Sequence, residues 1–279
     1  TGVDDNISDG NSAFRIVLDN SSSTAAAEYV GLNPPDVMLS NLDDETPGFL
    51  ISAISGNLVE KGGSATFTVK MTSQPTSSVD IPLLVSDTSE ATVLGDNTTH
   101  LRFTTSNWNA DHVVTLSAVD DSESDGTQSF YVNLGADNST LDTSGYRGLD
   151  PQDVAAATQD DESAGFLVSS VSGSVTEEGG QALFTVRLTS QPSGSVALSV
   201  SSDNTSEATV SPLTLTFTGT NWRSEQAVRV TGVDDNISDG NSAFRIVLDN
   251  SSSTAAAEYV GLNPPDVALT NVDDETPGF

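Results

Sequence analysis

The chain contains one segment that occurs three times. Residues 1–36 recur without change as residues 231–266, and a diverged copy begins at Ser117. The offsets between the three starting points are 116 and 114 residues, so the repeating unit is about 115 residues long. A unit of that length exceeds one turn of a solenoid and has the size of an independent domain. Near-identical domains in series indicate selection for length and mechanical character.

Acidic runs followed by a Gly-Phe pair mark the ends of the repeats. Asp-Asp-Glu stands at residues 43–45, 160–162 and 273–275, and Gly-Phe follows each run within a few residues. We therefore predict two complete repeats, residues 48–164 and 165–279, after the C-terminal part of a preceding repeat, residues 1–47. A complete repeat is long enough to bury its own core, and the shorter piece is not.

Short strands fill each repeat. Apolar and polar residues alternate over five segments of the last repeat, residues 182–190, 196–201, 213–218, 227–233 and 244–248. Gly, Pro, Asn and Ser interrupt the pattern at short intervals, and no segment has the 3.6-residue period of a helix. About seven strands in such a unit predict an antiparallel β-sandwich. The fold is thus predicted to be all-β, with tandem sandwiches joined end to end.

The chain is strongly acidic. Forty Asp and Glu residues against nine Lys and Arg give a formal net charge of −31. The negative electrostatic field of such a chain repels nucleic acid and anionic membranes and excludes them as partners. Two interpretations remain: a solvated acidic surface, as in proteins from saline habitats, or a cation-binding surface. There is no cysteine, apolar run of membrane-spanning length or signal peptide, so we expect a disulfide-free segment of a larger soluble protein.

The placement of the acids favours cation binding. If seven strands, A to G, reverse direction in turn, the ends of A, C, E and G share one pole of the sandwich. In the last repeat those ends carry Glu177, Asp203, residues 234–239 and residues 273–275, whereas the Gln-Pro, Asn-Trp and Asn-Pro-Pro turns of the opposite pole hold few acids. Carboxylates packed within about 4 Å repel by roughly 4 kcal/mol per pair at an effective dielectric near 20. Such a pole requires bound cations.

Calcium is the predicted ion, because it takes several oxygen ligands and tolerates irregular geometry, whereas magnesium demands a stricter octahedron. Zinc and copper are disfavoured by the absence of Cys and by only two histidines, His100 and His112, which we interpret as surface residues. Residues 234–240 lack the EF-hand spacing. Trp108 and Trp222 recur in a turn with no second aromatic nearby, which favours core packing over sugar stacking.

The acidic motifs resemble a known family. Val175-x-Glu177-x-x-Gly180, the Val233-Asp234-Asp235 turn and the terminal Asp273-Asp274-Glu275 are similar to the Calx-beta module. That family is an immunoglobulin-like sandwich that binds calcium at one pole. Longer strings such as SxxSEATV and VTGVDDNxxDG more closely resemble tandem repeats of very large bacterial surface adhesins of the RTX type, which are exported by type I secretion.

The resemblance implies calcium ligands in every repeat. They are Asp4, Asp5, Asp9, Asp43 and Asp44 in the first piece, Glu60, Asp120, Asp121, Asp125, Asp160 and Asp161 in the central repeat, and Glu177, Asp234, Asp235, Asp239, Asp273 and Asp274 in the last. The ligand after strand C is Asp87 in the central repeat and Asp203 in the last, where a one-residue slip leaves the alignment open. The number of ions per pole is also open.

These observations predict a structural extender and no enzyme. Calcium at the poles and linkers would stiffen the tandem domains into a monomeric rod that projects distal adhesive domains from the surface of a Gram-negative bacterium. The expected partners are calcium ions and neighbouring repeats, without nucleic acid or membrane insertion. A glycan- or protein-binding module that uses the Asn-rich loop of residues 249–265 stays open. A glycoside hydrolase is disfavoured, because crowded acids cannot hold two distinct pKa values in a cleft.

Overall fold

The computed structural model describes residues 1–20, 26–96, 98–137, 141–250, 255–276 and 278. Phe279 and part of the Asn-rich loop, residues 251–254, lie outside this set. The described residues are in strands and loops, with two 3₁₀ turns, Ala27–Tyr29 and Ala257–Tyr259, and no α-helix. The predicted all-β class is confirmed. No helix within the described part of the chain has the length and apolar character needed to cross a membrane.

The chain divides into two compact units. The first unit comprises residues 1–119 and 129–158, and the second comprises residues 120–128 and 159–279. The loop of residues 120–128 therefore belongs to the central repeat by sequence and to the second unit by its contacts.

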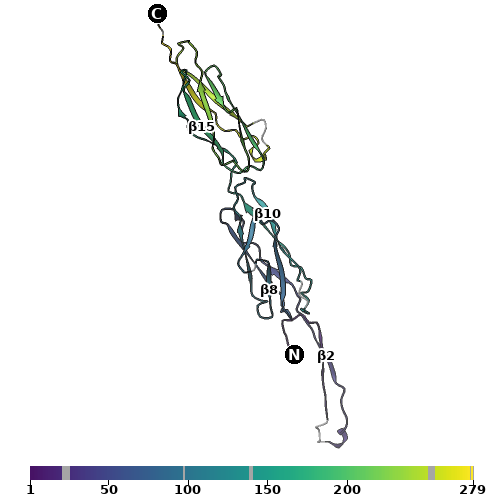
Figure 1. Ribbon diagram of the computed structural model, residues 1–279. Helices are drawn as coiled ribbons and strands as arrows, with labels where there is room; N and C mark the ends of the chain where they lie inside the picture. The colour runs from purple at the N-terminus through teal and green to yellow at the C-terminus, as the bar shows by residue number, and fades with distance from the viewer. Residues whose placement is uncertain (21–25, 97, 138–140, 251–254, 277, 279) are drawn as a thin grey trace. The chain divides into compact units, whose positions relative to one another are not determined.

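The central repeat is a sandwich of two sheets (Figure 1). One sheet has the strand order β3 (Phe49–Ile51), β5 (Ser64–Met71), β9 (His112–Ala118) and β7 (Ala91–Leu94). The other has the order β4 (Leu58–Val59), β11 (Val154–Gln159), β10 (Gln128–Leu134), β6 (Val79–Val85) and β8 (His100–Phe103). The alternating side chains of both sheets point into one core, which is the arrangement expected from a period-two pattern.

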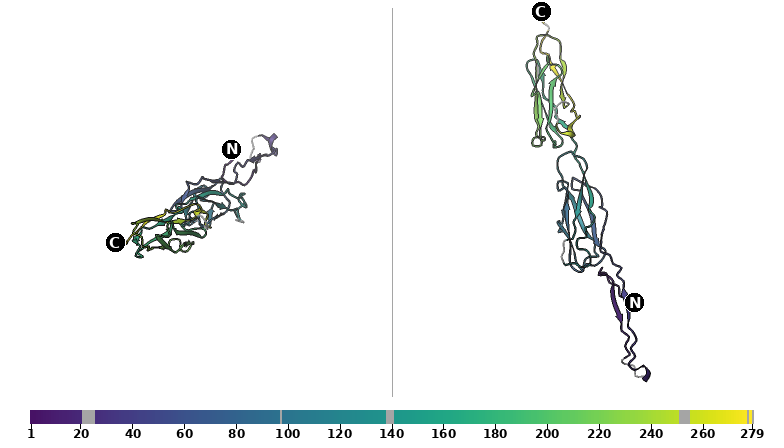
Figure 2. Two further views of the ribbon diagram at one scale, coloured as in Figure 1. Left: turned by 90° about the horizontal axis from the view of Figure 1, so that it is seen from above. Right: turned by 90° about the vertical axis from the view of Figure 1, so that its right-hand side faces the viewer.

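The last repeat has the same architecture (Figure 2). Its first sheet has the order β12 (Phe166–Val168), β15 (Gln181–Leu188), β19 (Gln226–Gly232) and β17 (Ala208–Ser211), with β13 (Ser172–Gly173) also paired to β15. Its second sheet has the order β14 (Val175–Thr176), β21 (Val267–Val272), β20 (Ser242–Asp249), β16 (Val196–Ser202) and β18 (Thr214–Phe217). β14 pairs with β21 in parallel, which brings the end of strand A beside the end of strand G.

Two of the seven predicted strands are each divided between the sheets. Segment A supplies β12 to one sheet and β14 to the other, and segment D supplies β17 and β18 in the same way. β17 pairs with β19 and β18 pairs with β16, so the D segment forms an edge of both sheets. A single crossing segment thus supplies one edge strand to each sheet, and each of these strands has only 4 residues, which limits the unpaired backbone groups that an edge exposes.

The core consists of the alternating residues that the sequence pattern indicated. In β15, Ala182, Phe184, Val186 and Leu188 are at most 1% exposed. Burial of each large apolar side chain contributes about 1.5–3 kcal/mol. Trp222 is 9% exposed and belongs to this core, and Trp108 is half-buried against the core of the central repeat, so the core-packing interpretation is confirmed.

The first piece forms a separate hairpin. β1 (Ser12–Ile16) pairs antiparallel with β2 (Val37–Asn41). Phe14 is 43% exposed, although Phe244, at the same position of an identical segment, is only 4% exposed. The difference arises because Phe244 packs against a second sheet, whereas the described residues of the hairpin provide none.

Candidate metal site

Each copy has an Asp-Asp loop, residues 4–10, 120–126 and 234–240, which begins with the same tight turn. In this turn the second Asp accepts a hydrogen bond from the amide two residues later. The donor and acceptor pairs are Ile7 N and Asp5 Oδ1 (2.8 Å), Glu123 N and Asp121 Oδ1 (2.7 Å), and Ile237 N and Asp235 Oδ1 (2.7 Å). The turn is an Asx-turn, a geometry for which Asp is favoured. The acidic character and the shape of the loop therefore come from the same residue.

A second carboxylate ties the Asp-Asp loop to the end of strand G. Asp273 accepts the Gly240 amide at Oδ2 (2.8 Å) and the Glu275 amide at Oδ1 (3.1 Å). Gly240 has a φ of +82°, so this position needs glycine. The Gly240 hydrogen bond lowers the pKa of Asp273. The same pair of bonds occurs in the other two copies, to Asp43 (2.6 and 3.2 Å) and to Asp160 (2.8 and 2.6 Å).

Glu177 supplies a buried carboxylate at the same pole. It follows β14, donates its amide to the Val272 carbonyl of β21 (3.1 Å), and is only 2% exposed. Its position depends on the following turn, in which Gly179 has a φ of +81° and a side chain at Gly180 would collide with backbone near Thr176. The Glu-x-Gly-Gly motif therefore has a steric cause.

Glu177 joins two groups of acids in the last repeat. One oxygen each of Glu177, Asp239 and Asp273 lie within 4.8 Å of one another, and so do single oxygens of Glu177, Asp274 and Glu275. These acids come from the end of strand A, the Asp-Asp loop and the segment after strand G. The strand-parity prediction placed these three ends at one pole.

The chemistry of this pole fits a cation with oxygen ligands. The Oε2 atoms of Glu177 and Glu275 are buried and have no hydrogen-bond partner. Burial, a hydrogen bond with Glu275 and the charges of Glu275, Asp273 and Asp235 together raise the pKa of Glu177 to about 7. A buried carboxylate needs either a proton or a positive partner. Calcium is a natural partner because all the available donors are oxygens.

The second unit also contains the acids of residues 120–125 and 160–162. Burial raises the pKa of Glu162, and the charges of Asp161, Asp160, Asp120 and Asp121 add to this shift. Burial likewise raises the pKa of Asp125, with contributions from Asp121 and Asp160. The Oε2 atom of Glu162 is buried without a hydrogen-bond partner. In the first unit, Glu60 occupies the position equivalent to Glu177 and is also 2% exposed.

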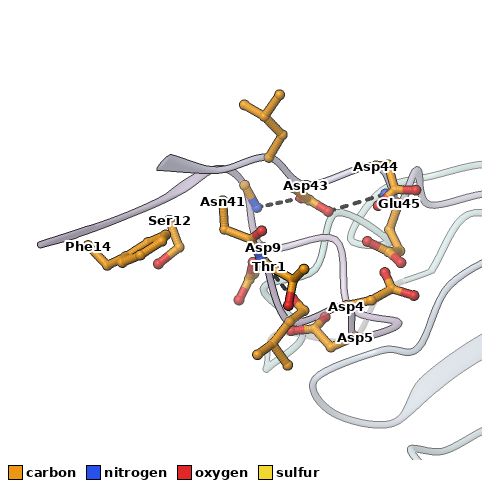
Figure 3. Close-up of a pocket in the computed structure, with 14 residues that line it drawn as sticks. Thr1, Asp4, Asp5, Asp9, Ser12, Phe14, Asn41, Asp43, Asp44 and Glu45 are labelled. Carbon is orange, nitrogen blue, oxygen red and sulfur yellow. Dashed lines mark hydrogen bonds between the residues drawn. The ribbon is translucent and has the colours of Figure 1, made fainter. Parts of the chain in front are cut away.

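The first piece presents a third acidic group. Asp4, Asp44 and Glu45 each offer an oxygen within 4.8 Å of the others. They line a pocket of about 550 Å³ together with Asp5, Asp9 and Asp43, and Figure 3 shows these side chains around the hollow. Burial raises the pKa of Glu45, and a hydrogen bond with Asp43 adds to the effect.

The two predicted strand C ligands are not part of these groups. Asp87 accepts hydrogen bonds from the amide and hydroxyl of Ser89 (3.0 and 2.5 Å), and Asn204 makes the equivalent bonds with Ser206. Asp203 instead accepts the Arg245 amide (2.7 Å). Asp87 therefore corresponds to Asn204, which resolves the one-residue slip. Metal ligation by Asp87 and Asp203 stays a prediction.

Sequence reasoning passed over two kinds of glutamate. The linker residues Glu45, Glu162 and Glu275 lie in the acidic clusters, although only the Asp residues of each Asp-Asp-Glu run were assigned as ligands. Glu90 and Glu207, in the recurring Ser-Glu-Ala-Thr-Val segment, are 5% and 8% exposed. The recurrence of Glu between Ser and Ala-Thr-Val in both repeats was the available signal, and it does not indicate burial.

Comparison with known proteins identifies a matching domain family. The Calx-beta domain model matches residues 1–46, 43–163 and 158–276. No curated protein matches the chain. Among solved structures, the calcium-binding domain CBD12 of CALX1.1 is 15% identical with a TM-score of 0.30, covering 69% of this chain and 76% of that one. CBD12 from CALX1.2 is 14% identical with a TM-score of 0.32, covering 78% and 96%. Domains 5–6 of the S-layer protein SbsC are 14% identical with a TM-score of 0.24, covering 82% and 100%.

Proposed function

The chain belongs to the Calx-beta domain family, and we propose that it is a calcium-stiffened extender segment of a large bacterial surface adhesin. The observation that carries the proposal is the grouping of Glu177 with Asp274 and Glu275. Glu177 belongs to the body of the sandwich, and the other two belong to the segment that leaves it. A cation held by all three would fasten that segment to the sandwich.

The linker between the central and last repeats shows why such fastening would matter. β11 ends at Gln159 and β12 begins at Phe166, so six residues separate them. The later part of this linker is attached to the last repeat, because Thr189 donates its hydroxyl to the Ser163 carbonyl (2.6 Å) and its amide to the Gly165 carbonyl (3.0 Å). The remaining residues, 160–162, are all acidic.

Calcium would immobilise this acidic part of the linker. Bound calcium supplies the positive charge that carboxylates at such spacing require. The ligands that we propose for the last repeat are Glu177, Asp239, Asp273, Asp274 and Glu275, together with Asp234 and Asp235, which the family resemblance implies. The equivalent acids at the end of the central repeat are Asp120, Asp121, Asp125, Asp160, Asp161 and Glu162. Without the ion, repulsion among these carboxylates would free the linker, and each junction would become a hinge.

The adhesin context follows from the same properties. Near-identical copies suit a chain whose task is length, and extracellular calcium modules commonly have dissociation constants of about 10⁻⁴–10⁻³ M. Such sites fill outside a cell and stay empty in the cytosol. We therefore propose an extracellular location at the surface of a Gram-negative bacterium, with the adhesive chemistry in other domains.

Small-angle scattering, thermal melting and calorimetric ion counting test the proposal on the whole chain. We expect saturable calcium binding, a higher melting temperature in calcium than in chelator, and a longer, better-defined maximum dimension in calcium. Equal melting temperatures in millimolar calcium and excess chelator would reject the metal site. A calcium-dependent melting temperature with an unchanged scattering profile would retain the site and reject the mechanical role.

A further inference from the structure

A backbone hydrogen bond links the Asp-Asp loop of one copy to the Ser-Gln-Pro turn of the next. In the second unit, the Gln191 amide donates to the Ser122 carbonyl (2.6 Å), and in the first unit the Gln74 amide donates to the Asn6 carbonyl at the same distance. Ser122 and Asn6 both follow the Asp-Asp pair, and both glutamines precede a proline. The same bond thus forms twice between equivalent positions.

The donor turn is held rigidly by its own repeat. Tyr259 is fully buried, and its hydroxyl contacts the amide, hydroxyl and carbonyl of Ser190 at 3.2, 2.9 and 2.7 Å. Glu258 accepts hydrogen bonds from the amide and hydroxyl of Ser193 (2.6 and 2.8 Å). Gln191 and Pro192 lie between these two anchors. The central repeat holds its turn in the same way, with Tyr146 on Ser73 and Asp142 on Thr76.

The acceptor loop is shaped by a hydrogen bond of its own. In the last repeat the Ile237 amide donates to Asp235 at 2.7 Å, the same distance as in the turn that contacts Gln191, although neither Ser-Gln-Pro turn of the described residues donates to the loop of the last repeat. Both partners are therefore preorganised, which reduces the entropy lost when they meet.

One junction has an additional side-chain contact. The Gln191 side chain donates its Nε2 to Glu123 Oε1 (3.1 Å), and the two residues also form an isolated β-bridge. At the other junction Ile7 takes the place of Glu123, and the Gln74 side chain donates to the Thr105 carbonyl of its own repeat (3.0 Å). The backbone bond is common to both junctions, and the side-chain bond is particular to the second.

We propose that the Ser-Gln-Pro turn is a docking element for the Asp-Asp loop of the preceding repeat, and that this clasp forms without a bound cation. Its partner is a second copy of the same module, recognised through the carbonyl after the Asp-Asp pair. The clasp is one of the contacts by which residues 120–128 belong to the second unit, together with the hydrogen bonds of Ser124 to Glu162 and of Gly126 to Asp160. The proposal does not rest on calcium binding, because every contact in it is a hydrogen bond between protein groups.

Amide hydrogen exchange in the whole chain, followed by NMR, tests the clasp. In both calcium and chelator we expect the amide at position 191 to be protected. Gln191→Glu places a carboxylate opposite Glu123 and should reduce this protection by about tenfold, the scale of a lost charge-assisted hydrogen bond. Adding Glu123→Gln restores a donor and acceptor pair, and should restore protection. Gln74→Glu is the matched control: it loses the side-chain hydrogen bond to the Thr105 carbonyl but meets no charge at Ile7, so the amide at position 74 should keep more of its protection than the amide at position 191 does in Gln191→Glu.

The outcomes separate this proposal from the calcium proposal. Rapid exchange at position 191 in both conditions would overturn the clasp, and so would protection that appears only in calcium. Neither result would alter the expected effect of calcium on melting. If Gln191→Glu unfolds the last repeat, seen as loss of protection at Val228, Glu123→Ala is used instead. That variant should lower protection at position 191 while leaving Val228 unchanged, and full protection at position 191 would reject the side-chain contact.

Discussion

Replacing Glu177 with Gln should change the stability of the last repeat in opposite directions with and without calcium. Glu177 is the only described residue shared by two acidic groups, and it is 2% exposed. Gln preserves the shape of the side chain and removes its charge. Burial and neighbouring acids raise the pKa of Glu177 to about 7, so at pH 8 the ion-free repeat must bury an unfavourable charge. In chelator, Glu177→Gln should therefore melt at a higher temperature than the unsubstituted chain.

In calcium the order should reverse. An ion at a hundredfold excess over its dissociation constant stabilises the folded state by about 2.7 kcal/mol per site. Unfolding a repeat of about 115 residues has an entropy of about 0.24 kcal/mol/K, so one occupied site raises the melting temperature by about 11 °C. Glu177→Gln removes a carboxylate from both groups and should lose most of this increase.

Fluorescence of Trp222, which is buried in the core of the last repeat, can follow this melting specifically. A Trp108→Phe background removes the signal of the central repeat. Glu178→Gln is the matched control. It removes the same charge from the neighbouring residue, which is exposed and lies outside the acidic groups. If Glu177→Gln retains the full calcium-induced increase, or if Glu178→Gln loses as much, Glu177 is no ligand.

Three further outcomes are expected. Tyr259→Phe should lower the free energy of unfolding of the last repeat by about 1–3 kcal/mol in urea denaturation, because the buried Tyr259 hydroxyl makes three hydrogen bonds. Tyr29 is the equivalent residue of an identical segment but is 59% exposed, so Tyr29→Phe should leave the free energy of unfolding unchanged. Because the pKa of Glu177 is raised, the folded chain keeps a proton that the unfolded chain releases. In chelator, the free energy of unfolding should therefore decrease as the pH rises from 4.5 to about 7. Calcium affinity, measured by calorimetry, should increase over the same pH range. Replacing Asp160 and Asp161 together with Asn should shorten the maximum dimension in small-angle scattering even in calcium, and an unchanged dimension would contradict their role in the linker.

The sequence predicted most of the fold because its pattern is local. The alternation over residues 182–190 and 244–248 corresponds to β15 and β20, whose buried residues are those of the apolar phase. The division of segments A and D between the sheets was missed. That division depends on which sheet edges are open, and a pattern along one segment carries no information about edges elsewhere.

The candidate site was predictable to a similar degree. Strand parity placed Glu177, Asp239 and Asp273 at one pole, and these three lie together. The place of Glu275 could not be read from the sequence, because it depends on the turn in which its amide binds Asp273. Glu207 was missed because its burial depends on contacts such as its hydrogen bond from Asn271 (3.3 Å), which lies far away in the sequence.

The Asp-Asp loop connects the two proposed interactions at the second junction. Asp121 shapes the turn by accepting the Glu123 amide, and it also contributes to the electrostatic field that raises the pKa of Glu162. The same turn presents the Ser122 carbonyl to Gln191. A cation that neutralised Asp121 would reduce the repulsion on this turn without replacing any of its hydrogen bonds, and so would hold the Ser122 carbonyl more firmly in its docking position. Calcium and the clasp would then stabilise each other, and protection of the amide at position 191 should rise further when calcium is added.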